Sequence, residues 1–226
     1  MSAEEPPFAH PSDSQLVTTA RMEDVMDAIE ALDMEAPWSD VRDGLRLVLP
    51  RRRPMPEHTG LLPTRDIGPG IRTSLGLDIG PAMLFISMDR LADWGVSLDQ
   101  AFEQALANIR GQVAARTHFA LISEDIADTP TLAFQSREGW ASGLLALPEL
   151  LFQVLGRDDG IILAPMRDLV LRLPPDSEPG LAERILDEFA RADMNALDIP
   201  PMALEHGQLG WARTPSVTSK TGHRLH

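Results

Sequence analysis

Three residue types on which many enzymes rely are absent or almost absent from this sequence. It contains no cysteine and no tyrosine, and Lys220 is the single lysine among its 20 basic residues. Without cysteine, the chain has no disulfide, no thiolate nucleophile and no Cys-ligated zinc or iron–sulfur site. Because Lys220 lies in a polar C-terminal tail, we expect no Walker A or Schiff-base lysine in the folded body. The patterns GxGxxG, GxSxG and HExxH are also missing, so most common enzyme signatures are absent.

Positive charge is scarce as well. The net charge is -14 and the isoelectric point is about 4.7. Nucleic acids bind to clustered Lys and Arg, so we expect no nucleic-acid partner, whereas a basic protein partner is compatible with this charge. The run at residues 51–53 has fewer arginines than the roughly four to eight basic residues typical of a lipid-binding cluster. We therefore expect a solvated loop there and no membrane contact.

Long apolar runs are missing too, since none approaches the roughly 20 residues that span a bilayer. The acidic start of the sequence has no apolar segment of the kind found in secretion signals. These features predict a cytoplasmic protein. Glu124, Asp125 and Asp128 lack the spacing and the glycine of an EF-hand loop, so we predict no metal site, and no cofactor is expected.

The clearest structural signal is a helix that begins near Ser97. Ser97 and Gln100 fit a capping box, in which the hydroxyl and the amide satisfy backbone groups of the first turn. Apolar residues then recur at spacings of three and four, which places them on one helical face. They are Leu98, Phe102, Leu106, Ile109 and Val113. Gly111 is expected to end this helix.

The rest of the pattern predicts an α+β fold. Apolar periodicity indicates helices near residues 19–34, 97–111, 141–156 and 179–193. Short apolar runs between turn residues predict strands, among them a hairpin made by 161–164 and 169–173.

We therefore predict a single domain over residues 14–212, in which about four helices pack on a mostly antiparallel sheet. Residues 1–13 and 213–226 are polar and aperiodic, and we expect both to be disordered.

Two short motifs link the predicted helix and hairpin to a known family. The segments MDRLADWGVSLDQAFEQALANIRG, GLLALPELLFQVLG and IILAPMRDLVLRLP contain an AL-x-N motif at 105–108 and a P-x-RD motif at 165–168. Over about residues 80–210 the chain resembles the bacterial YtpQ-like proteins, which are uncharacterised. The resemblance implies a cytosolic α+β domain. Because the family has no established activity, it implies no catalytic residue.

Arg167, Asp168 and Asn108 are the candidate binding residues. Arg167 and Asp168 lie between the two strands of the predicted hairpin, and Asn108 lies on the helix expected to pack nearby. In one interpretation the three line a small pocket for an anionic or polar ligand. In the other, Arg167 or Asp168 closes a turn and pairs with a buried backbone group. Trp94 is expected to anchor the core, with ligand stacking as the alternative.

Two classes of function remain open. The missing enzyme signatures and the acidic composition favour a non-catalytic binding or protein-interaction domain, whose partner is a basic protein or a small polar ligand. The alternative is a hydrolase or lyase in which Asp168, with His118 or Glu138, acts as acid and base on a small polar substrate. A pocket around Asp168 would favour the enzyme, and a filled, flat surface would favour the binding domain.

Overall fold

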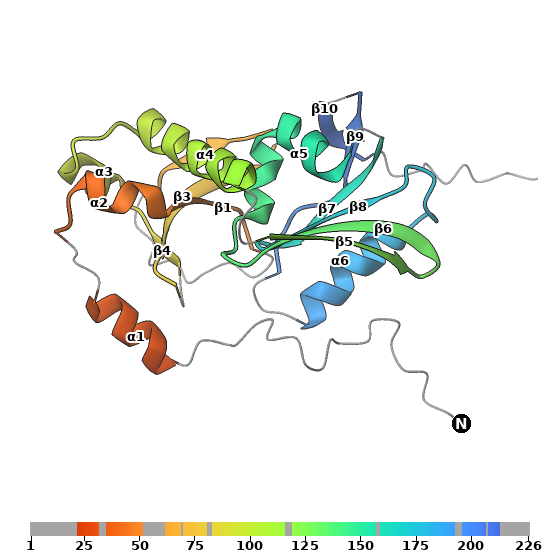
Figure 1. Ribbon diagram of the computed structural model, residues 1–226, viewed down its shortest axis with the longest axis horizontal. Helices are drawn as coiled ribbons and strands as arrows, with labels where there is room; N and C mark the ends of the chain where they lie inside the picture. The colour runs from red at the N-terminus through yellow and green to blue at the C-terminus, as the bar shows by residue number, and fades with distance from the viewer. Residues whose placement is uncertain are drawn as a thin grey trace, which may run out of the picture.

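The computed structural model describes residues 22–31, 35–51, 62–68, 70–80, 83–115, 119–156, 159–192, 196–206 and 208–212. Within these residues the strands form two antiparallel sheets, and helices pack on each of them (Figure 1). The predicted α+β class is confirmed, with the strands divided between two sheets instead of gathered in one. The segments expected to be disordered, 1–13 and 213–226, lie outside the described residues.

The smaller sheet has four strands. They are β1 (Leu45–Val48), β2 (Thr64–Asp66), β3 (Arg72–Asp78) and β4 (Met83–Phe85). β3 is central, with β1 on one side and both β2 and β4 on the other. A Cβ at Gly76 in β3 would lie 2.7 Å from side-chain atoms of both Met83 and Val48, so only glycine fits between these neighbours.

The larger sheet has six strands in the order β10-β9-β7-β8-β6-β5. Their bounds are β5 (Phe119–Ile126), β6 (Thr129–Ser136), β7 (Gly160–Met166), β8 (Leu169–Leu173), β9 (Met202–Glu205) and β10 (Gln208–Trp211). The predicted β7–β8 hairpin is confirmed. β7 runs through Pro165, and its register shifts between Leu163 and Met166, where proline has no N–H to give to the ladder.

Helices cover both sheets. α4 (Leu98–Ala115) lies across the smaller sheet, mainly on β1. The 3₁₀ helix η2 (Ala141–Ala146) and α5 (Pro148–Leu155) cover one face of the larger sheet, and α6 (Leu181–Ala192) covers the other (Figure 1). Each of these helices buries an apolar stripe against strands, which is where most of its stability in water arises.

A single buried cluster joins the two sheets. It includes Leu45 and Leu75 from the smaller sheet, Phe134 and Val170 from the larger one, and Ile109 of α4 between them. All five side chains are at most 1% exposed. A second buried cluster lies between α6 and the other face of the larger sheet, with Leu171 and Ile185 among its members.

Backbone pairing joins the two sheets as well. Arg51, just after β1, forms an isolated antiparallel bridge with Leu197. The Leu197 N–H donates to the carbonyl of Pro165 in β7 at 2.9 Å. The segment at 196–199 therefore links the end of β1 to the larger sheet.

The predicted start of α4 is confirmed, and its predicted end is wrong. The Gln100 N–H donates to Ser97 Oγ at 3.2 Å, and the Ser97 N–H donates to Gln100 Oε1 at 2.9 Å. The helix continues through Gly111 to Ala115, because Val113 in its last turn is buried in the core. Burying valine offsets the roughly 1 kcal/mol that glycine costs inside a helix.

The other predicted helices are found, and residues 19–21 and 32–34 of the first of them lie outside the described ranges. α1 covers Met22–Ala31, and the region at 141–156 is divided into η2 and α5 by Pro148, which occupies the first turn of α5. Three short elements complete the fold: α2 (Trp38–Val41), the 3₁₀ helix η1 (Arg42–Gly44) and α3 (Met88–Asp93). No helix of the described ranges is long and apolar enough to cross a membrane.

The turn between β5 and β6 gives a prediction on stability. Its two residues, Ala127 and Asp128, have φ values of 47° and 61°, a left-handed region that Gly, Asn and Asp tolerate and that alanine occupies at a cost. Two-residue hairpins with two positive φ values prefer Asn-Gly. We expect the double variant Ala127→Asn/Asp128→Gly to raise the free energy of unfolding by about 1 kcal/mol. Urea denaturation checks this, and a less stable variant would contradict it.

Candidate functional site

Two tryptophans that are far apart in the sequence meet at the surface of the smaller sheet. Trp38 begins α2, and Trp94 follows α3. Their ring centroids are 5.7 Å apart and their planes are tilted by 52°. Both side chains are half-buried, with one side against the core. Trp94 therefore does anchor the fold, as expected, and it also leaves part of its ring at the surface.

Local sequence signals hold these rings in place. The side chain of Ser87 caps α3 by accepting a hydrogen bond from the Arg90 N–H. Gly95, with a φ of 66°, ends α3 directly after Trp94. The Trp94 indole N–H donates to the carbonyl of Ala36 at 3.0 Å, so the segment before α2 is attached to the end of α3.

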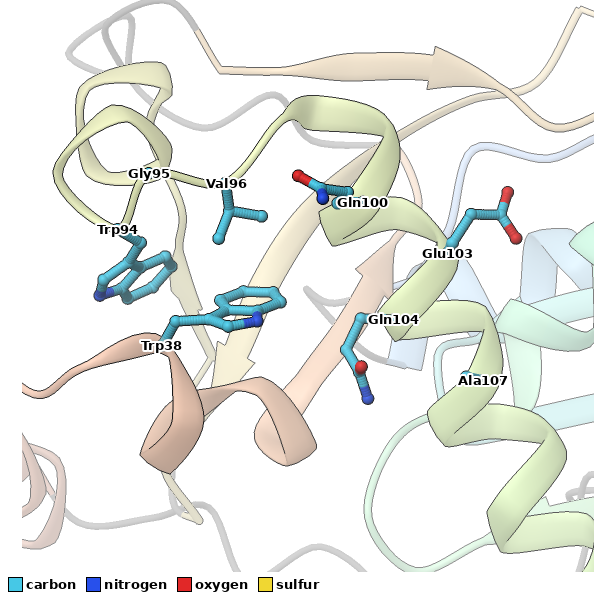
Figure 2. A pocket seen from close by; sticks show the side chains of 8 residues that line it. All are labelled: Trp38, Trp94, Gly95, Val96, Gln100, Glu103, Gln104 and Ala107. Atoms are coloured by element: carbon cyan, nitrogen blue, oxygen red, sulfur yellow. The ribbon is translucent and has the colours of Figure 1, made fainter.

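A pocket of about 580 Å³ opens beside the tryptophan pair. The two indole rings and Val96 form one side, and the first turns of α4 form the other, through Gln100 and Gln104 (Figure 2). A second pocket of about 460 Å³ shares both tryptophans. The volume of the first lies within the range of about 300–1,000 Å³ that is usual for ligand sites.

Polar groups of the first pocket include several without a partner in the part of the chain that the structure describes. There, the Trp38 indole N–H has no hydrogen-bond acceptor, and in Figure 2 it points toward the α4 side of the pocket. Gln104 uses its amide N–H on Asn108 Oδ1 at 2.8 Å, which leaves its carbonyl oxygen available. Gln100 uses its carbonyl oxygen in the cap of α4, which leaves its amide N–H₂ available.

The charges around the tryptophan pair are largely paired with one another. Glu103, on the rim of the first pocket, lies 3.2 Å from Arg65. On the side of the second pocket the Arg90 guanidinium lies over the Trp94 ring, 5.6 Å from its centroid, and 3.9 Å from Asp93. The first pocket therefore combines apolar rings and neutral amides with little net charge.

The residues lining the first pocket do not form an acid–base or nucleophilic pair. Glu103 is their single ionisable side chain, and they include no His, Ser or Thr. Catalysis by acid and base needs two positioned groups, or one with a nucleophile. Among the residues described, no group of three or more His, Asp or Glu side chains is placed to hold a metal ion. The lining of this pocket consists of aromatic, aliphatic and amide groups together with Glu103.

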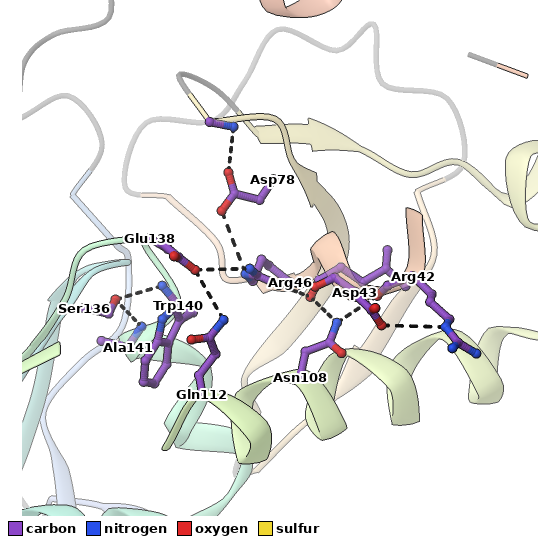
Figure 3. Close-up of polar contacts among 12 residues, drawn as sticks. Arg42, Asp43, Arg46, Asp78, Asn108, Gln112, Ser136, Glu138, Trp140 and Ala141 are labelled. Carbon is purple, nitrogen blue, oxygen red and sulfur yellow. Dashed lines mark hydrogen bonds and ion pairs between the residues drawn. The ribbon is translucent and has the colours of Figure 1, made fainter. Parts of the chain in front are cut away.

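A buried arginine network lies elsewhere, between the two sheets (Figure 3). Arg46 of β1 is 6% exposed, and its guanidinium donates to the carbonyls of Asp43 and Leu45 at 2.9 and 3.0 Å. Its Nε lies 3.9 Å from the Asp78 carboxylate, and its Nη2 lies 3.5 Å from Glu138 Oε2. Glu138 follows β6 of the larger sheet, so this network connects the two sheets.

Glu138 also accepts a hydrogen bond from Gln112 of α4 at 3.4 Å. The sequence around Arg46 gives no sign that this side chain is buried. Its partner Glu138, which we considered as an acid or base, is held here by Arg46 and Gln112. Through these contacts Glu138 connects the larger sheet to β1 and α4.

The three predicted binding residues are placed in two different surroundings. Arg167 and Asp168 form the turn between β7 and β8, and their carbonyls accept hydrogen bonds from Ser142 N–H at 2.9 Å and Ser136 N–H at 2.8 Å. Arg167 also lies against Gly139, where an added Cβ would come within 2.9 Å of Arg167 Nε. Both residues close a turn on buried backbone, which is one of the two roles expected for them.

Asn108 contacts a different part of the fold. Its amide donates to the carbonyls of Arg42 and Leu45 at 2.8 and 3.0 Å, and so fixes α4 to the start of β1. Neither of the two pockets is lined by Asn108, Arg167 or Asp168. A polar pocket made by these three residues stays a prediction. His118, the expected partner of Asp168, lies outside the described residues.

The chain matches no known protein-family model, no curated protein and no solved structure. The resemblance to the YtpQ-like proteins therefore stays a prediction that rests on the segments quoted above.

Proposed function

We propose that this chain is a non-catalytic binding domain that acts in the cytoplasm. It holds a segment of a partner protein in the first pocket, between the tryptophan pair and α4, which is called the Trp38–Trp94 pocket below. The observation that supports it best is the pair of half-buried indole rings beside a pocket with neutral hydrogen-bonding groups. Tryptophan is enriched in binding hot spots, because its large ring contributes apolar area and its N–H contributes direction.

The charge of the chain supports a protein partner that is basic overall. With a net charge of -14, the chain attracts a positively charged partner over distances beyond direct contact. The attraction raises the association rate more than the affinity of the complex. The pocket itself has little net charge, so it would supply the contacts while the remaining surface supplies the attraction.

A peptide-display experiment tests the proposal and does not require the partner to be identified first. Random peptides of ten residues are selected on the full chain, and the enriched peptides are titrated against purified variants. We expect Trp38→Ala to weaken binding at least about thirtyfold, the effect of losing a hot-spot residue worth 2 kcal/mol or more. Trp211→Phe, at a tryptophan on β10 that does not line the pocket, should bind as the unmodified chain does.

Two outcomes would contradict the proposal. If no peptide is enriched, the chain is not a peptide-binding domain. If Arg167→Ala abolishes binding while Trp38→Ala does not, the site lies at the β7–β8 turn, and the prediction for Arg167 and Asp168 takes its place. Circular dichroism of each variant establishes that a loss of binding is not a loss of folding.

A further inference from the structure

We infer that the Trp38–Trp94 pocket is specific for an extended, proline-containing segment in the polyproline II conformation. This inference rests on the proposed function and adds the class of ligand to it. Three properties of the pocket support it: the arrangement of its aromatic rings, the hydrogen-bonding groups it leaves available, and the balance of its charges.

The rings offer surfaces of the size and kind that proline needs. Proline-rich segments bind in grooves lined by aromatic side chains, because the flat, apolar pyrrolidine ring packs on an aromatic face. Here two indole rings with centroids 5.7 Å apart and planes tilted by 52° line one side of the pocket, and Val96 extends this apolar wall. A polyproline II helix has three residues per turn, so residues three apart in the ligand present themselves to the same wall.

The available polar groups match a backbone that is rich in acceptors. A polyproline II segment has no internal hydrogen bonds, so its carbonyls are open to donors, and proline removes backbone N–H groups. The pocket offers three donor groups, namely the Trp38 indole N–H, the amide of Gln100 and the second N–H of the Gln104 amide. The carbonyl oxygen of Gln104 is available as an acceptor. An excess of donors over amide acceptors suits a chain in which some residues are proline.

The charges argue against an arginine or lysine side chain as the main ligand group. A cation on an aromatic ring is stabilised by a nearby carboxylate, but Glu103 already lies 3.2 Å from Arg65. On the side of the second pocket, Arg90 already lies over the Trp94 ring. A cationic ligand would therefore compete with these arginines for the same carboxylate and ring, whereas a neutral proline ring needs no carboxylate.

The sequences enriched by selection on the full chain test this inference. We expect prolines, with a preference for two prolines three residues apart. An enriched peptide should lose at least tenfold in affinity when these prolines are replaced by alanine. Trp38→Phe keeps a ring and removes the N–H, so we expect it to weaken binding about three- to tenfold, the effect of one hydrogen bond. Trp211→Phe is the matched control and should not change the affinity.

The outcomes separate the inference from the proposed function. Enriched peptides that need Trp38 but contain Arg or Lys without proline would overturn the inference and leave the binding domain in place. Peptides that keep their affinity after proline-to-alanine replacement would do the same. If Trp38→Ala leaves the binding of every enriched peptide unchanged, both the inference and the proposed site are overturned.

Discussion

Arg46→Met is expected to lower the free energy of unfolding by about 3 kcal/mol, because it leaves two carboxylates and two backbone carbonyls without the guanidinium that they share. Breaking a buried ion pair by removing one partner costs about 3–5 kcal/mol. We expect the lower end, since the side chains of Asp78 and Glu138 are 17% and 32% exposed and regain some hydration. Methionine retains an apolar side chain of similar length, so the loss of stability measures the contribution of the guanidinium group. Urea denaturation measures it.

A cycle of variants separates the charge from the packing. If uncompensated carboxylates cause the loss, adding Asp78→Asn and Glu138→Gln to Arg46→Met should recover part of it, because neutral amides cost less to leave half-buried. A triple variant that is even less stable than Arg46→Met would mean that the carboxylates are not the source. An ordinary surface substitution changes the free energy of unfolding by roughly 0.5 kcal/mol or less. If Arg46→Met changes it by no more than that, the prediction itself is contradicted.

The pair formed by Arg184 and Glu178 is the exposed control. Its atoms are closer, at 2.8 Å, but its side chains are 54% and 65% exposed. The hydrogen bond from Arg184, followed by its charge, holds the pKa of Glu178 below its ordinary value. A lowered pKa contributes stability above the pKa of the unfolded state, and this contribution is lost as the pH falls through the folded value. Because water screens the pair, Arg184→Ala should change stability little at any pH.

The sequence was sufficient to predict elements whose signals are local. The capping box of Ser97 and Gln100 and the apolar spacing of α4 concern residues within one helix, and both were predicted correctly. The hairpin of β7 and β8 could also be predicted, because its turn residues and its apolar alternation are adjacent in the chain. Local physics decides where such elements begin.

The candidate site depends on contacts between distant residues, which periodicity does not reveal. Arg46 meets Glu138 across 92 residues, and the Trp94 indole meets the carbonyl of Ala36 across 58. Trp38 lies in a short stretch before β1 with no repeating pattern, so nothing in the sequence pairs it with Trp94. The one available signal was the presence of two tryptophans outside clear strands in a chain with few aromatic residues.

Phe134→Ala is expected to lower the free energy of unfolding by about 4 kcal/mol, within the range of 3–5 kcal/mol for removing a buried aromatic ring. Phe134 is fully buried on β6, and its ring centroid lies 4.8 Å from that of Phe119 and 5.4 Å from that of Trp140. Its cross-strand neighbour Leu121 is 51% exposed, so Leu121→Ala should cost less than about 1 kcal/mol. Equal losses for the two variants would contradict the prediction.

The same variant tests whether the two sheets form one cooperative unit. Because one buried cluster contains Phe134 and also Leu75 of β3, damage in the larger sheet should destabilise the smaller one. Hydrogen exchange measures the free energy of opening at each amide. In Phe134→Ala we expect this free energy to fall by similar amounts in β3 and β7, by about 4 kcal/mol in each if both exchange by global unfolding. Loss in β7 with β3 unchanged would mean that the sheets unfold separately. The Trp38–Trp94 pocket, which lies at the smaller sheet, would then belong to an independent unit.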